Sequence, residues 1–203
     1  MKYTIIEDCS PYYIRFTHDG LDDIVNYCKK NIPSVEDQGT FIHHPFSKEQ
    51  ADHLLSLLPM AKQMPLRPHR VSLFITKPGR YYRAHKDGMA DRFSINYTIQ
   101  ILDEDCITSW YSDEDLKNYP IDNLPNKSSR ECVGFDKTKH TPLKSMTAKP
   151  NECILFNSDI FHDFDNQNST NLRVVLTLRI MENVQRDTYF KDAKRMLFGE
   201  YTD

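Results

Sequence analysis

The spacing of hydrophobic and polar residues changes about one third of the way along the chain. Before that point, two segments carry apolar residues at helical intervals, one from Asp19 to Asn31 and one that opens at Ser47. The second starts with Ser47-Lys-Glu-Gln50, a capping-box pattern that marks the beginning of a helix. We therefore expect residues 1–65 to be mostly helical.

From residue 66 to residue 181 the period is two, which is typical of strands with one buried face. The alternation is clearest in Phe93–Ile101, and Lys77-Pro-Gly-Arg80 is a turn signal between two earlier runs. The expected strands are 71–76, 80–86, 93–101, 106–111, 131–135, 143–147, 152–157, 161–165 and 172–181. Many short strands framed by helices indicate a mainly β fold, an antiparallel sandwich or barrel of the jelly-roll kind.

The length of 203 residues fits a single domain, 1–203. Its core is predicted to occupy 66–181, interrupted by a polar, proline-containing insertion at 111–130. Apolar residues on a helical stripe near the C-terminus predict a helix within 182–203. The polar insertion belongs to the core and does not separate two domains.

Composition excludes several classes of function. The formal charge of −3 shows no basic surplus for nucleic acid or acidic membranes, and the six glycines form neither G-x-G-x-x-G nor a P-loop. Five widely spaced cysteines without C-x-x-C indicate buried free thiols in a reducing compartment. No apolar run is long enough to span a membrane, and Glu7 interrupts the N-terminus before a signal-like stretch develops. We expect a cytoplasmic location.

Three residues have side chains suited to holding one metal ion. His85 and Asp87 form an H-x-D pair on a predicted strand, where residues i and i+2 share a face. By itself this pair favours the interpretation of His85 as an ordinary strand histidine. His162, in a second predicted strand, can supply a third ligand. Two histidines and one carboxylate on one face of an ion are the facial triad of non-haem Fe(II) oxygenases.

Two arginines lie close after the third of these residues. Arg173 and Arg179 are six positions apart in an otherwise apolar strand, so they share a face. A buried charge requires a partner, and a dicarboxylate cosubstrate would supply one in the bidentate geometry that suits arginine. Alternatively, one or both arginines lie at a sheet edge and pair with Asp163 or Asp165.

The order of these residues resembles the Fe(II)/2-oxoglutarate-dependent dioxygenase superfamily over about residues 70–181. The segment Pro78-Gly-Arg-Tyr-Tyr82-Arg-Ala-His85-Lys-Asp87 resembles the Y-x-x-H-x-D segment of prolyl 4-hydroxylases. The segment from Leu155 through His162 to Arg173 is similar to the second half of the aspartyl/asparaginyl β-hydroxylase core. Prolyl 4-hydroxylases generally hold the distal carboxylate with lysine, whereas Arg173 stands here.

The resemblance implies a double-stranded β-helix (jelly-roll) core with Fe(II) held by His85, Asp87 and His162. It implies that 2-oxoglutarate is the cosubstrate and O₂ the oxidant, with succinate and CO₂ as products. Arg173 would pair with the far carboxylate of 2-oxoglutarate. Tyr82 would donate a hydrogen bond to the cosubstrate. Asn96 is a further candidate for the same pocket. The expected activity is hydroxylation of an amino-acid side chain, peptidyl or free, or of a small metabolite.

Two other functions remain open from the sequence. A metal-binding jelly-roll module without catalysis would use the same His/Asp cluster, although it would not need Arg173. An alkylated-nucleic-acid demethylase is suggested by Arg173, Thr177 and Arg179, which partly match the R-x-N-x-T-x-R strand of those enzymes. Val175 replaces the asparagine of that pattern. We expect a protein or small-molecule substrate, no nucleic-acid partner and no membrane partner.

Overall fold

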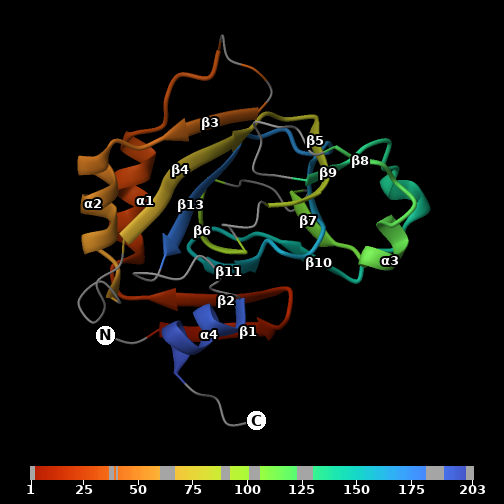
Figure 1. Ribbon diagram of the computed structural model, residues 1–203. Coiled ribbons are helices and arrows are strands. Elements are labelled where there is room, and N and C mark those ends of the chain that lie inside the picture. The colour runs from red at the N-terminus through yellow and green to blue at the C-terminus, as the bar shows by residue number, and fades with distance from the viewer. Residues whose placement is uncertain are drawn as a thin grey trace.

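The computed structural model describes residues 3–36, 39, 41–59, 67–87, 92–100, 106–122, 130–181 and 190–199. Within these ranges two antiparallel sheets face each other, and helices lie on the outside (Figure 1). In order across the larger sheet, the strands are β1 (Tyr3–Cys9), β2 (Tyr13–His18), β11 (Cys153–Asn157), β6 (Phe93–Gln100), β13 (Arg173–Met181), β4 (Arg67–Thr76) and β3 (Phe41–Pro45).

The smaller sheet carries the strands that surround the predicted H-x-D pair. In order, its strands are β10 (Lys144–Thr147), β7 (Ile107–Trp110), β12 (His162–Asn166), β5 (Arg80–Lys86), β9 (Arg130–Cys132) and β8 (Ile121–Asp122). The mainly β jelly-roll fold is therefore confirmed, and all nine strands predicted between residues 66 and 181 are present with shifts of a few residues at their ends.

The alternation along the strands of the larger sheet separates two environments. On β13, Leu176 and Leu178 point outward and are fully buried under the helices, whereas Arg173, Val175, Thr177 and Arg179 point toward the smaller sheet. The outer apolar face packs against α1 (Leu21–Lys30), α2 (Lys48–Ser56) and α4 (Phe190–Phe198). The polar side chains of β13 thus face the space between the two sheets and not the solvent.

Aromatic side chains fill one end of the space between the sheets. Trp110 from β7 stacks on Tyr13 from β2 at 5.3 Å between ring centroids and packs against Phe156 from β11 at 5.1 Å. Its indole N–H donates to the carbonyl of Asn157. This apolar cluster leaves the opposite end of the interior for the polar side chains.

The N-terminal third departs from the prediction. Both expected helices are present, and Ser47 and Gln50 form the capping box at the start of α2. However, β1, β2 and β3 lie in the same region, so the prediction that residues 1–65 are mostly helical is wrong. The large sheet overrides local propensity here: β2 pairs with β11, and β3 pairs with β4.

The structure describes parts of the insertion and of the C-terminal segment that the sequence predicts. The insertion begins with α3 (Asp113–Leu116) and continues to β8, while residues 123–129 lie outside the described ranges. Within 182–203 the structure describes the helix α4, and residues 182–189 and 200–203 lie outside the described ranges. All five cysteines are free thiols and four of them are buried, whereas Cys9 is only half-buried. No helix of the described chain is both long enough and apolar enough to cross a membrane.

His18, a buried histidine on β2, predicts a pH dependence of the free energy of unfolding. The Nε2 of His18 lies 3.0 Å from the Tyr97 hydroxyl, and burial lowers its pKa below the ordinary value of 6.5. As the pH falls below 6.5, His18 therefore takes up a proton more readily in the unfolded chain than in the folded protein. The free energy of unfolding decreases in that pH range. Between about pH 8 and about pH 5, urea unfolding should show a smaller loss of stability for His18→Asn than for the wild type.

The control for this measurement is His53→Asn, because His53 lies exposed on α2. It should keep the pH dependence of the wild type. An identical dependence in all three proteins contradicts the assignment to His18.

Candidate functional site

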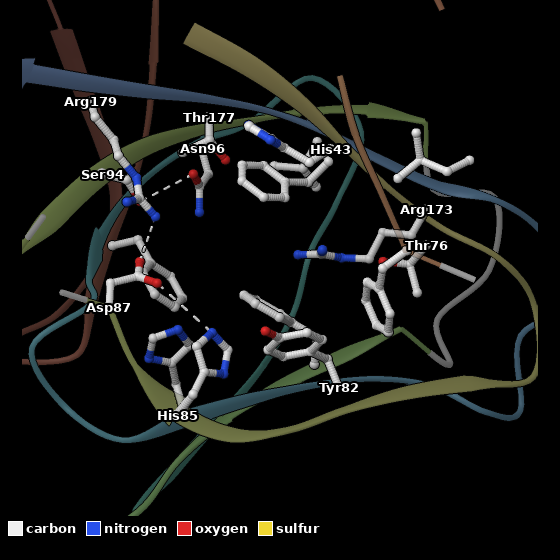
Figure 2. A pocket seen from close by; sticks show the side chains of 17 residues that line it. His43, Thr76, Tyr82, His85, Asp87, Ser94, Asn96, Arg173, Thr177 and Arg179 are labelled. Atoms are coloured by element: carbon white, nitrogen blue, oxygen red, sulfur yellow. Dashed lines mark hydrogen bonds and ion pairs between the residues drawn. The ribbon is translucent and has the colours of Figure 1, made fainter. Parts of the chain in front are cut away.

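A cavity of about 260 Å³ lies between the two sheets, beyond the Trp110 cluster. Figure 2 shows polar side chains pointing into it from both walls. The large sheet supplies Thr76, Ser94, Asn96, Arg173, Thr177 and Arg179, and the opposite wall supplies Tyr82, His85, Asp87 and His162. Burying so many polar groups is costly unless they have partners, so the cavity has the character of a ligand site.

The predicted metal ligands lie together on one side of this cavity. His85 and His162 are directly paired in the ladder between β5 and β12, and their ring centroids are 4.3 Å apart. Asp87 follows the end of β5, and its backbone N–H donates to the carbonyl of Ser158. Potential ligand atoms of His85, Asp87 and His162 all lie within 4.8 Å of one another. This donor set of two nitrogens and one oxygen fits a divalent transition metal.

Backbone contacts fix the tautomer of both histidines. The Nδ1 of His85 lies 2.9 Å from the carbonyl oxygen of Arg83, and the Nδ1 of His162 lies 2.8 Å from that of Ile160. A carbonyl oxygen only accepts, so each Nδ1 carries a hydrogen, and Nε2 is the nitrogen that offers a lone pair when the ring is neutral. Burial, reinforced by the neighbouring His85, holds the pKa of His162 well below its usual value. His162 is therefore neutral, as a metal ligand must be.

A β-bulge in β5 brings Tyr82 to the same wall as His85. Their separation of three residues would place the two side chains on opposite faces of a regular strand. His85 is opposite His162, and Tyr82 is opposite Phe164. Between these two pairs, β5 has two residues and β12 has one, which is the arrangement of a β-bulge. As a result, the rings of Tyr82 and His85 meet edge to face at 4.5 Å.

Arg173 lies at the other end of the cavity from the metal-ligand candidates (Figure 2). It is only 6% exposed, and its guanidinium carbon lies 4.5 Å over the ring centroid of Phe164. Its Nε is buried and has no hydrogen-bond partner among the described residues. A buried guanidinium in this condition is suited to an anionic ligand.

Arg179 has a partner within the protein, and it is the candidate metal ligand Asp87. The Nη2 of Arg179 donates to Oδ2 of Asp87 at 2.7 Å, and both side chains are largely buried. Within the described part of the chain, the alternative pairing with local acids is not found. Asp163 accepts hydrogen bonds from the Tyr111 hydroxyl and the Ser109 backbone, and Asp165 pairs with Lys137.

Asn96 lines the cavity, and its side-chain oxygen accepts a hydrogen bond from the Ser94 hydroxyl. The edge strand β3 adds wall residues that the sequence analysis missed, namely Phe41 and His43, and β4 adds Phe74. His43 stacks on Phe74 at 4.9 Å. The signal in the sequence that indicates these wall residues is the alternation in Phe41-Ile-His-His-Pro45, in which Ile42 belongs to the core beneath the helices.

Comparison of the sequence with models of protein families and with curated proteins finds no match. Solved structures do match. They include HygX from Streptomyces hygroscopicus with nickel and 2-oxoglutarate bound, at 9% identity and a TM-score of 0.56, covering 84% of this chain and 82% of HygX. The epimerase SnoN, in complex with Fe³⁺, α-ketoglutarate and nogalamycin RO, has 12% identity and a TM-score of 0.54 over 84% of this chain and 78% of SnoN.

EvdO2 from Micromonospora carbonacea var. aurantiaca, complexed with 2-oxoglutarate, has 13% identity and a TM-score of 0.53. The match covers 91% of this chain and 96% of EvdO2. This chain has the fold of the Fe(II)/2-oxoglutarate-dependent enzymes. This fold is the one that the resemblance implied, and the finer resemblance to prolyl 4-hydroxylases stays a prediction.

Proposed function

We propose that this protein is an Fe(II)- and 2-oxoglutarate-dependent oxygenase. One observation carries the proposal: the two-histidine, one-carboxylate cluster shares a cavity with a buried arginine whose Nε has no partner among the described residues. A metal-binding module without catalysis accounts for the cluster but leaves Arg173 buried at a cost and without a use. Val175 and the charge of −3 do not favour a nucleic-acid demethylase.

His85, Asp87 and His162 would hold the Fe(II), with the two Nε2 lone pairs and one carboxylate oxygen as donors. Bound Fe(II) would supply oxidative decarboxylation of 2-oxoglutarate by O₂, giving succinate and CO₂, coupled to oxidation of a substrate C–H bond. The protein's part is to hold these three ligands rigidly through backbone hydrogen bonds and to exclude bulk water with the surrounding aromatic rings.

Arg173 would bind the carboxylate of 2-oxoglutarate that is remote from the metal. The contact of its guanidinium with the ring of Phe164 limits the orientations of the fork, so that less conformational entropy is lost on binding. Tyr82, on the wall between the two ends of the cavity, would donate its hydroxyl hydrogen to the cosubstrate. Asn96, on the opposite wall, offers an amide to either the cosubstrate or the substrate.

The substrate is proposed to be a small molecule or an amino-acid side chain that is hydroxylated. HygX and SnoN are described with hygromycin B and nogalamycin RO bound, and SnoN is an epimerase. A small molecule is therefore the class of substrate that these neighbours favour, and hydroxylation is the outcome proposed for this chain.

The proposal is tested by adding Fe(II) and 2-oxoglutarate to the protein without O₂. A weak visible absorption band from metal-to-cosubstrate charge transfer should appear, and admission of O₂ should yield succinate. Glutarate, which lacks the 2-keto group, should give no band. If neither the band nor succinate forms with 2-oxoglutarate, the protein is not such an oxygenase.

The ion pair between Arg179 and Asp87 predicts a change of stability that metal reverses. In metal-free Arg179→Met, Asp87 loses its buried partner, and the free energy of unfolding should fall by about 3 kcal/mol. A bound cation replaces the lost charge, so saturating Mn²⁺ should raise the melting temperature of the variant more than that of the wild type. Differential scanning fluorimetry with and without Mn²⁺ measures both effects.

Lys194→Met is the matched control, because Lys194 pairs with Asp8 at 2.8 Å in a more exposed position away from the cavity. Loss of this pair should cost less than about 1 kcal/mol, with the wild-type response to Mn²⁺. An equal response to Mn²⁺ in wild type and Arg179→Met contradicts the assignment.

A further inference from the structure

A line of aromatic rings crosses the cavity from the edge of the large sheet to the metal-ligand candidates. Phe41 on β3 meets Tyr82 on β5 edge to face, with 4.7 Å between centroids and an angle of 74°. Tyr82 meets His85 at 4.5 Å and 75° in the same manner. The ring of Tyr82 is therefore held from two sides, by Phe41 and by His85.

The two contacts differ in what anchors them. His85 is fixed by its hydrogen bond to the Arg83 carbonyl and by its place beside His162. Phe41 comes from another sheet and belongs to the edge strand β3, whose register with β4 pairs Phe41 with Thr76. Its ring is a contact from the large sheet that limits how Tyr82 can rotate within the cavity. Edge-to-face pairs of this kind contribute interaction free energy in addition to that from the burial of their apolar surface.

We propose that Phe41 is a positioning residue that aims the Tyr82 hydroxyl at the cosubstrate. This inference rests on the proposed function, because it assumes that Tyr82 donates a hydrogen bond to 2-oxoglutarate. Phe41 itself lies outside the H-x-D segment and acts through Tyr82. Without Phe41, the phenol ring samples other orientations, and part of the binding free energy of 2-oxoglutarate is spent on ordering it.

The test is a double-mutant cycle of Phe41→Ala and Tyr82→Phe. The dissociation constant of 2-oxoglutarate is measured on the Fe(II)-loaded protein without O₂, from the charge-transfer band. Phe41→Ala should weaken 2-oxoglutarate binding roughly threefold to tenfold, the range expected for one aromatic pair. In the Tyr82→Phe background, where no hydroxyl remains to be aimed, Phe41→Ala should change the affinity less than about twofold.

Two further variants keep the result interpretable. Phe41→Leu preserves most of the apolar volume, and its dissociation constant for 2-oxoglutarate should lie between those of the wild type and Phe41→Ala. If the alanine variant is unstable, Phe41→Leu should still bind 2-oxoglutarate more weakly than the wild type. His44→Ala changes the same strand at a half-buried residue that does not line the cavity and contacts Phe46, and it should leave 2-oxoglutarate affinity at the wild-type value.

The outcomes separate the two proposals. If the wild type gives no band with 2-oxoglutarate, the proposed function fails and takes this inference with it. If the wild type binds 2-oxoglutarate but Phe41→Ala and Phe41→Leu bind it equally well, the inference alone is overturned. Equal losses from Phe41→Ala in the wild-type and Tyr82→Phe backgrounds likewise overturn it, because Phe41 then acts independently of the hydroxyl.

Discussion

Replacing His162 with alanine is expected to reduce Fe(II)-dependent conversion of 2-oxoglutarate to succinate by roughly three orders of magnitude, about 4 kcal/mol of transition-state stabilisation. His162 is 1% exposed and offers its Nε2 within the cluster of candidate ligands. Its loss leaves two donors, His85 and Asp87, which cannot complete a facial triad. Succinate release under saturating Fe(II) and 2-oxoglutarate measures the effect.

The alanine also leaves a void, because the ring of His162 packs against Phe156 at 4.7 Å and Phe164 at 5.5 Å. His162→Gln fills more of that space and should show the same loss of activity with a smaller loss of thermal stability. His53→Ala, on the exposed face of α2, serves as the control with wild-type activity. Turnover that survives in His162→Gln and still requires Fe(II) rules out His162 as a ligand.

Replacing Arg173 with methionine should weaken 2-oxoglutarate binding by about 200- to 1000-fold, or roughly 3–4 kcal/mol. This is the cost of leaving a buried carboxylate without its cationic partner. The same substitution should stabilise the cosubstrate-free protein by about 1 kcal/mol, because the buried Nε that lacks a partner is removed. Titration of the charge-transfer band and urea unfolding measure the two effects, which are opposite in sign.

Arg173→Lys distinguishes charge from shape at this position. Lysine keeps the positive charge but loses the planar fork that stacks on Phe164, so an intermediate affinity is expected. The assignment of Arg173 to the cosubstrate is refuted by a methionine variant that is less stable without ligand and binds 2-oxoglutarate normally.

The sequence predicts the strands of the core well because their alternation is regular. The runs at 93–101 and 172–181 contain apolar residues at every second position, and both form central strands of the large sheet. Two of the N-terminal strands, β2 and β3, escape prediction because they pair with strands that are distant in the sequence. Phe41–Pro45 is short, lies at an edge and pairs with a strand about 30 residues later, which no local pattern records.

The candidate site is predicted in part. The spacing of His85 and Asp87, and of Arg173 and Arg179, places each pair on one face, and the cavity contains all four. The face of Tyr82 could not be predicted, since it depends on a bulge that only the pairing of β5 with β12 determines. The partner of Arg179 was equally hidden, because Asp87 lies 92 residues away in sequence.

The strands of the large sheet divide their residues between two tasks. The outward face needs only apolar side chains of suitable volume beneath the helices, a requirement that many sequences meet. The inward face sets the chemistry, residue by residue. Substitutions on the inward face therefore change the chemistry of the cavity, and they cost folding free energy where they break a buried contact such as the pair of Arg179 with Asp87. Identities of 9–13% with HygX, SnoN and EvdO2 are what such a division of labour permits.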